Sequence, residues 1–407
     1  MIDRRDELVR ALEEACEIEH GLMIQYLYAA LSMKRRLDEG LTTAQQVAVR
    51  QWMAATILVA REEMGHFATV CNLLAAIGAA PHFARPNMPR KTGYYPFPFD
   101  LQPFGDPALY RFMVFELPQG MPLPPPPEAD LDAQALAASP VPDPLDYTYV
   151  GELYEQIRAG FRAIPEQDLF IGPPSTQNAP SQWDGMDMRP IATRADAEAA
   201  IGWIVEQGEG TPGNRENSHY DRFADARDAY YRMGRFAAAR AVPVNPATRE
   251  QRDRDGPVVL IRNPLSLRAA ETLNAIYAVM LSMLQHAFSI APELEANAAR
   301  AAALRQALQA ASHQIMSVGV RPLAEWLSEQ PLDDPQEPAR AGPTFELYGP
   351  LNLPPWPEAR WVLLFEALDR CAAAATELGP PGSRPAQVAQ SLRYLRRNLH
   401  VAVRGRP

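Results

Sequence analysis

Glutamate and histidine side chains recur in this chain at spacings that suit metal ligation. Glu63 and His66 form an E-x-x-H pair, which places both side chains on one face of a helix about one turn apart. Glu19 lies in an earlier apolar pattern, and Glu206 precedes a second histidine, His219. Buried carboxylates are costly without a compensating positive charge, and carboxylate with imidazole suits iron or manganese. These residues predict a metal centre of one or two ions, with iron expected and manganese as the alternative.

Two long helices are expected to position the first of these residues. Residues 4–37 carry an apolar stripe at three- and four-residue steps, and Glu19 interrupts it near the middle. Residues 43–79 carry a second stripe, which includes Glu63 and His66. An E-x-x-H spacing alone arises by chance in many helices. Its combination with an inward carboxylate on another helix, and with the later cluster, favours shared metal ligation.

The second cluster is less regular and leaves the partner of His219 open. Glu216 has the E-x-x-H spacing to His219, but it lies in a segment rich in glycine and proline that does not set its helical phase. Glu209 is the alternative, about one turn after Glu206. We favour Glu206, Glu209 and His219 as the ligands from this part of the chain. Glu62, beside Glu63, is the weaker inward candidate on its helix.

Composition places the chain among acidic globular proteins. The 407 residues carry a formal net charge of −10, and no run of lysine and arginine stands out. These features argue against nucleic acid and membrane surfaces as partners, and an acidic surface by itself selects no partner. An N-terminus without an apolar signal core, three cysteines and no apolar run of membrane-spanning length predict a cytoplasmic protein. Homo-oligomerisation is compatible with this composition but is not specified by it.

Helical periodicity continues through the second half, and prolines gather between the helical patterns. The expected later helices cover residues 264–290, 296–328, 357–378 and 385–400. The chain contains 40 prolines. They cluster in segments 81–127, 139–146, 165–190 and 330–362. The sequence therefore predicts an all-α helical bundle over residues 1–330 with long Pro-rich loops inserted at about 80–190. Residues 331–407 are expected to form a C-terminal helical extension packed on the bundle.

Several blocks of sequence resemble a known family. The most specific are the segment from Glu63 to Gly78 and the segment from Gly208 to Phe223. Further blocks are EIEHGLMIQYLYAALSMK, FMVFELP, TYVGELYEQI, DLFIG and AGPTFELYGP. In this order they are similar to ferritin-like proteins of the iminophenyl-pyruvate dimer synthase type, which include imine-coupling enzymes of violacein and indolocarbazole pathways. The resemblance spans about residues 5–378 and implies a ferritin-like bundle. The metal ligands that it implies are Glu19, Glu63, His66, Glu206 and His219, with Glu209 as a further one.

The same resemblance implies a function. It indicates a metal-dependent, non-haem iron oxidoreductase that acts on a small aromatic or amino-acid-derived metabolite. The specific version is oxidative imine coupling in natural-product biosynthesis. The alternative from another class is a non-catalytic iron-binding or assembly module of a biosynthetic complex. A bundle without metal is the third hypothesis, and it would leave Glu19, Glu63 and Glu206 buried without a counter-charge.

Overall fold

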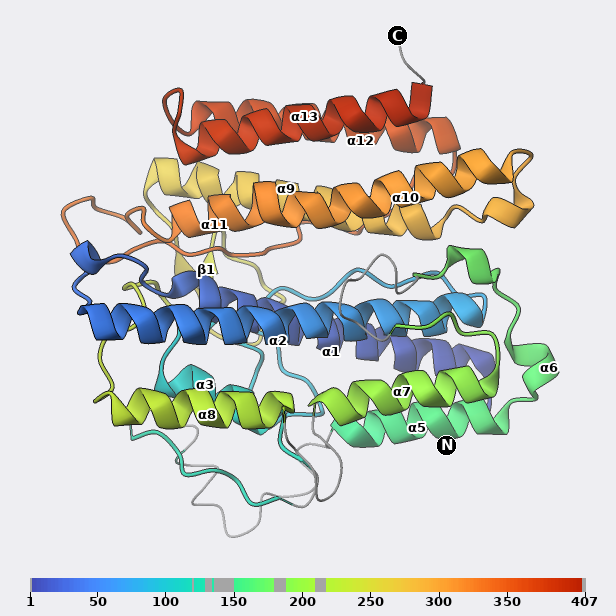
Figure 1. Ribbon diagram of the computed structural model, residues 1–407, viewed down its shortest axis with the longest axis horizontal. Helices are drawn as coiled ribbons and strands as arrows, with labels where there is room; N and C mark the ends of the chain where they lie inside the picture. The colour runs from blue at the N-terminus through green and yellow to red at the C-terminus, as the bar shows by residue number, and fades with distance from the viewer. Residues whose placement is uncertain are drawn as a thin grey trace.

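Helices account for almost all of the regular structure. The computed structural model describes residues 2–118, 121–128, 134, 150–178, 188–208 and 217–404. Figure 1 shows these helices stacked in successive layers, with their axes roughly aligned. Strand in the described residues is confined to a short parallel pair, β1 (Pro246–Ala247) and β2 (Val259–Leu260). The predicted all-α class is confirmed.

Two long helices form the central layer. They are α1 (Arg5–Ser32) and α2 (Thr43–Ala76), joined through the short helix η1 (Leu37–Glu39). From Ile18 to Ser32 every residue of α1 is buried, as expected of a helix that is covered on both sides. The start of α2 is fixed by a capping box, in which the Thr42 hydroxyl accepts from the Gln45 amide and the Gln45 side chain accepts from the Thr42 amide.

A layer of shorter helices covers one face of α1 and α2 (Figure 1). Its members are α3 (Asp106–Phe115), α5 (Val150–Ala163), α6 (Glu166–Leu169), α7 (Arg194–Gly208) and α8 (His219–Arg232). The short helix η2 (Pro174–Thr176) follows α6 but contacts the opposite side of α2. Within this layer α3 packs on α8, and α5 packs on α7. Ser218 caps α8 because its hydroxyl accepts from the Asp221 amide at 3.3 Å. This cap sets where the first residue of α8, His219, enters the bundle.

The opposite face of the central layer is covered by the second half of the chain. Its helices are α9 (Pro264–Phe288), η4 (Pro292–Leu294), α10 (Ala298–Ile315), a π-helical turn η5 (Met316–Val320) and α11 (Arg321–Leu327), followed by α12 (Pro357–Glu377) and α13 (Arg384–Arg404). The last two helices form the outermost layer, on α9 and α10 (Figure 1). These bounds lie within a few residues of the periodic patterns. No helix in the described part of the chain is both long and apolar enough to cross a bilayer.

The segment from Ala341 to Leu347 runs through the interior rather than over the surface, because each of its residues is buried. Glu346 is buried there and forms an ion pair with the buried guanidinium of Arg254. Its other oxygen accepts from the hydroxyl of Thr248 at 2.7 Å and from the amide group of Asn274 in α9 at 3.3 Å. A buried charge with several partners is costly to break from one side, because the other charge stays buried without compensation.

We therefore expect Glu346→Ala to lower the free energy of unfolding by about 3–5 kcal/mol, the cost of leaving Arg254 buried without its partner. Chemical denaturation followed by circular dichroism measures this. Glu366→Ala is the matched control, because Glu366 forms an exposed pair with Arg370, and we expect a change of less than about 0.5 kcal/mol. Equal effects of the two substitutions would show that the buried pair does not hold this segment.

Candidate metal centre

Three carboxylates and two imidazoles converge between the central layer and the layer of short helices. Glu19 comes from α1, and Glu63 and His66 come from α2. Glu116 directly follows α3, and His219 opens α8. They form two groups that share Glu63: one with Glu19 and His66, the other with Glu116 and His219. Within each group the candidate ligand atoms lie within 4.8 Å of one another, and all the members are buried.

His66 presents one ring nitrogen to the carboxylates and the other to an amide. Its Nδ1 lies 3.1 Å from Glu63 Oε2 and 3.5 Å from Glu19 Oε2. Its Nε2 lies 2.8 Å from Gln207 Oε1, near the end of α7. An acceptor at Nε2 fixes the hydrogen there and leaves the Nδ1 lone pair for a cation.

His219 repeats this arrangement in the second group. Its Nδ1 lies 2.7 Å from Glu63 Oε1 and 3.6 Å from Glu116 Oε2, while its Nε2 lies 3.1 Å from Glu62 Oε2. Glu62 also pairs with Arg222. Burial acts to raise the pKa of Glu62, but the neighbouring His219 and Arg222 outweigh it and lower that pKa. Glu62 is therefore an ionised acceptor that orients His219, as carboxylates do for metal-bound histidines.

Two tyrosines hold the outer carboxylates. The Tyr154 hydroxyl in α5 donates to Glu19 Oε1, and the Tyr26 hydroxyl in α1 donates to Glu116 Oε1. Burial and the adjacent carboxylates raise the pKa of both phenols well above its usual range, so they remain protonated donors. Each outer carboxylate thus has one oxygen fixed by a tyrosine and the other facing a histidine.

The pKa shifts at this site show how protons alone can balance the negative charge of its carboxylates. Burial, reinforced by the nearby charge of Glu63, raises the pKa of Glu19 to about 7. Burial acts to lower the pKa of His66, but the charges of Glu63 and Glu19 outweigh it and raise that pKa to about 10. The pKa of His219 is raised well above its usual value in the same way, chiefly by Glu63 and Glu116. Without another cation, protons on the imidazoles neutralise the carboxylates.

The residues present fit a pair of metal ions. A cavity of about 30 Å³ lies at the cluster, lined by Glu19, Glu63, His66 and Glu116 among others, and it has room for small ions or water. Glu63 Oε1 and His219 Nδ1 are 2.7 Å apart, yet neither has a hydrogen-bond partner. Two buried polar atoms that face each other without hydrogen-bond geometry are what a shared cation would satisfy. The carboxylate and imidazole donor set suits iron or manganese.

A family model described as ferritin-like matches residues 12–228. The chain belongs to the ferritin-like family. Its shared Glu63 and paired groups lie within the matched region. A solved structure titled as a ferritin-like protein from Caulobacter vibrioides is also similar, with 19% identity, a TM-score of 0.43, and coverage of 71% of this chain and 88% of that one.

Two curated relatives confirm the resemblance of this ferritin-like chain to the iminophenyl-pyruvate dimer synthase type. A dichlorochromopyrrolate synthase from Lentzea aerocolonigenes is 29% identical over 390 residues, covering 85% of this chain and 36% of the relative. A 2-imino-3-(indol-3-yl)propanoate dimerase from Chromobacterium violaceum is 27% identical over 334 residues, covering 72% and 30%. The chain thus spans about a third of the length of each of these relatives.

The structure of the ferritin-like chain brings together Glu19, Glu63, His66 and His219, as expected from sequence, but not Glu206. Glu206 is exposed on α7, so the expectation that it faces inward is wrong. The buried face of α7 carries Ile201, Ile204 and Gly208, and residue 206 lies about 200° round the helix from residue 204. The next residue, Gln207, reaches the site instead. Glu209 and its alternative Glu216 lie outside the described residues.

Glu116 and Glu62 are the functional candidates that periodicity did not single out. Glu116 follows the last residue of α3, so no helical stripe marks it. Its one signal is position, because it is the acidic residue at the end of the apolar block FMVFELP. Gly208 also contributes, since a Cβ atom there would come within 3.1 Å of Glu116 Oε2. Glu62, the weaker inward candidate, contacts His219 rather than the shared cavity.

Exchanging a carboxylate for its amide distinguishes Glu116, the ligand that the structure places at the site, from Glu206, the ligand expected from the sequence. We expect Glu116→Gln to weaken iron(II) binding by more than about 100-fold, because a ligand is lost while the shape and the bond to Tyr26 are kept. The matched control is Glu206→Gln, which should leave metal content unchanged. Plasma mass spectrometry of both variants and metal titration measure this. Loss of metal in Glu206→Gln with retention in Glu116→Gln would favour the ligand set read from the sequence.

Metal binding should release protons and strengthen with pH. Between pH 7 and 10 the metal must displace the proton of His66 and that of His219, whose pKa is also raised. Below about pH 7 it must also displace the proton of Glu19. We expect the apparent affinity for manganese(II) to rise by about tenfold per pH unit for each proton released. Titration calorimetry in buffers of different ionisation enthalpy, from pH 6 to 8, counts the protons. An affinity independent of pH in this range would contradict the described charge balance.

Proposed function

We propose that this chain is a metal-dependent oxidoreductase, with iron as its metal, that acts on a small aromatic or amino-acid-derived metabolite. The observation that carries the proposal is Glu63, whose two carboxylate oxygens face two different histidines at 3.1 and 2.7 Å. Glu63 would hold the metal together with His66 and Glu19 on one side and with His219 and Glu116 on the other. Bound iron would supply the electron-transfer chemistry with O2 that amino-acid side chains lack.

The protein's own contribution is to hold this set and keep water out. Glu19 and Glu116 are each fixed through one oxygen by a buried tyrosine, and the imidazoles are fixed through Nε2 by Gln207 and Glu62. Such fixed outer contacts orient ligands and tune a metal site. The neighbouring side chains Leu22, Ile204 and Val205 line the cavity with apolar surface.

The specific version that the relatives support is oxidative coupling of imines. One relative is named for dimerisation of 2-imino-3-(indol-3-yl)propanoate. Joining two imino acids through one new carbon–carbon bond removes two electrons and two protons. With O2 as oxidant these reduce it to hydrogen peroxide, so the reaction balances without a further reductant. We infer that this chain contributes to a reaction of this class.

The difference in length between this chain and its relatives supports a second candidate function. The relatives are about three times longer than the part that this chain matches, so their named activity is that of longer chains. A chain of the present length could then serve as a non-catalytic iron-binding or assembly module of a biosynthetic complex. The two hypotheses predict the same metal site but different turnover.

The test combines metal content with turnover. Iron-loaded protein is supplied with O2 and the imine formed from indole-3-pyruvate and ammonium, and O2 uptake and coupled product are recorded. The oxidoreductase hypothesis predicts repeated turnover that Glu63→Gln reduces by at least about 100-fold together with metal content, while Glu206→Gln retains both. O2 uptake that stops once the added iron is oxidised, with no product, would favour the binding module. Full turnover in metal-free Glu63→Gln would refute the metal-dependent mechanism.

A further inference from the structure

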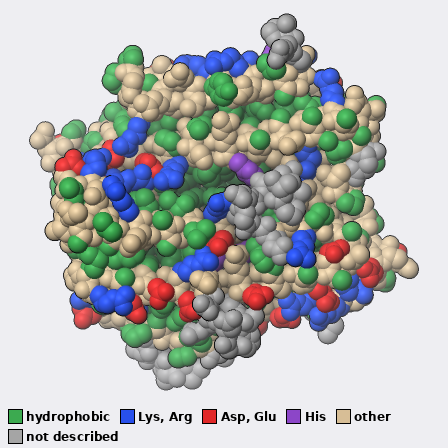
Figure 2. Space-filling view, viewed as in Figure 1, with side chains coloured by type: hydrophobic (Ala, Val, Ile, Leu, Met, Phe, Trp, Pro, Cys, Tyr) green, Lys and Arg blue, Asp and Glu red, His purple; other side chains and the backbone are tan. Residues whose placement is uncertain are grey.

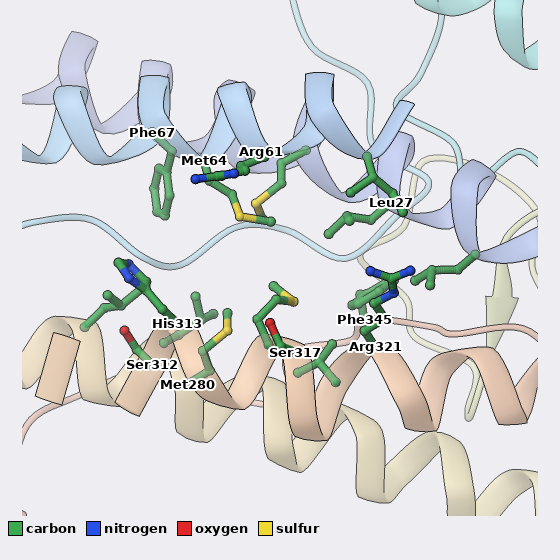
Figure 3. Close-up of a pocket in the computed structure, with 17 residues that line it drawn as sticks. Leu27, Arg61, Met64, Phe67, Met280, Ser312, His313, Ser317, Arg321 and Phe345 are labelled. Atoms are coloured by element: carbon green, nitrogen blue, oxygen red, sulfur yellow. The ribbon is translucent and has the colours of Figure 1, made fainter. Parts of the chain in front are cut away.

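A well-formed cavity lies on the side of α1 and α2 opposite the layer of short helices. Its volume is about 500 Å³, within the usual range for small-molecule sites. The walls come from α1 and α2 on one side and from α9, α10 and η5 on the other (Figure 3). In Figure 2 this face of the molecule is hollowed, with a hydrophobic floor and basic side chains at its margins.

The body of the cavity is apolar and adaptable. Methionine side chains reach it from four elements, namely Met23 of α1, Met64 of α2, Met280 of α9 and Met316 of η5. Phe67 adds an aromatic ring. Thioethers are polarisable, make favourable contacts with aromatic rings and adapt to their outline. Such a lining suits a flat aromatic ligand.

Polar groups are gathered at one end. In Figure 3, Arg61 of α2 and His313 of α10 point into the cavity from opposite walls, close to Phe67. Burial, together with the nearby charge of Arg61, lowers the pKa of His313. A guanidinium has five donors in a planar fork, so it can bind a carboxylate in addition to any other partner that it has.

The titratable side chains of the described lining are all of basic residue types. Arg61, His313 and Arg321 are its titratable side chains, and no carboxylate is among the described residues that form its wall. Arg321, at the other end, pairs with Glu325, which lies outside the wall. The chain as a whole carries a formal charge of −10. A basic, apolar cavity in an acidic protein is complementary to an apolar anion.

The backbone of one wall departs from regular helix at the cavity. The helix that begins with α10 widens into the π-helical turn Met316–Val320 and continues as α11. Met316, Ser317 and Val320 of this turn all line the cavity. Single π-turns within α-helices occur frequently at functional sites.

The cavity is distinct from the metal centre. On α2 the residues that face the two sites alternate: Glu63 and His66 face the centre, whereas Met64 and Phe67 face the cavity. Adjacent helical residues differ by about 100° in direction, so α2 forms a wall between the two sites. None of the residues of the metal centre lines this cavity.

We propose that this cavity is a second ligand site, which binds an apolar aromatic acid with its carboxylate between Arg61 and His313 and its ring system among the methionines. The proposal does not depend on the metal or on the reaction at the centre.

The test compares an acid with its neutral isostere. Indole-3-propionate and indole-3-propanamide are titrated against the metal-free 407-residue chain by ligand-observed NMR. We expect the acid to bind with a Kd of about 1 mM or tighter for a ligand of this size. We expect Arg61→Gln to weaken binding of the acid by about ten- to hundredfold, with little effect on the amide. Arg50→Gln is the matched control, since Arg50 is exposed on the same helix and does not line the cavity.

A steric pair of variants locates the site. Ser317→Trp places a large side chain in the cavity and should abolish binding of the acid. Gln314→Trp adds the same side chain at an exposed position outside the lining and should not. Circular dichroism confirms that each variant is folded. The proposal would be overturned if the wild type bound the acid no more tightly than the amide and Arg61→Gln did not change this. It would also be overturned if the wild type bound neither ligand at millimolar concentration. Binding that requires metal and is lost in Glu63→Gln would place the ligand at the metal centre and also overturn it.

Discussion

The organisation of this chain depends on the burial of Glu63. Its carboxylate lies between two imidazoles in the interior, with Glu19 and Glu116 close behind them. A cluster of this charge cannot be buried without compensation, whether by protons or by metal. The surrounding helices are arranged to supply partners for each member. Tyr154 and Tyr26 bind the outer carboxylates, and Gln207 and Glu62 orient the imidazoles.

These supporting contacts show what the layer of short helices contributes to the centre. α5 contributes Tyr154, α7 contributes Gln207, α3 leads into Glu116 and α8 begins with His219. Each of these helices is short and packs on only one face of the central pair. Their ends, rather than their middles, meet at the centre. At one of these ends Glu116 can approach closely because Gly208 has no side chain, since an added Cβ atom would lie 3.1 Å from Glu116 Oε2.

Much of this arrangement could be predicted from the sequence, because apolar residues recur at three- and four-residue steps along the long helices. The stripes of α1 and α2 carried Glu19, Glu63 and His66 inward, and the structure brings these three side chains together. The all-α class and the ferritin-like family followed from the same patterns and blocks, and both are confirmed. Whether the cluster binds metal stays a prediction.

The other parts of the site and the cavity could not be predicted from the spacing of apolar residues. Glu206 was assigned inward by resemblance and spacing, but the phase of α7 is set by Ile201 and Ile204, which turn it to solvent. Glu116 lies one residue beyond a helix, where its direction depends on how α3 packs on α8 rather than on any repeat. The cavity between α2 and α10 was invisible for a similar reason, since it is formed by side chains from helices far apart in the chain.

The π-turn at Met316–Val320 has a consequence for comparing this chain with its relatives. Such a turn takes up one more residue than an ordinary helical turn, so everything after it is rotated relative to what precedes it. A homologue lacking that residue would keep the same overall helix but would present a different set of side chains to the cavity. Deletion of a single residue there would therefore change which side chains line the cavity while the helical bundle is kept. Ligand preference within the family could diverge in this way.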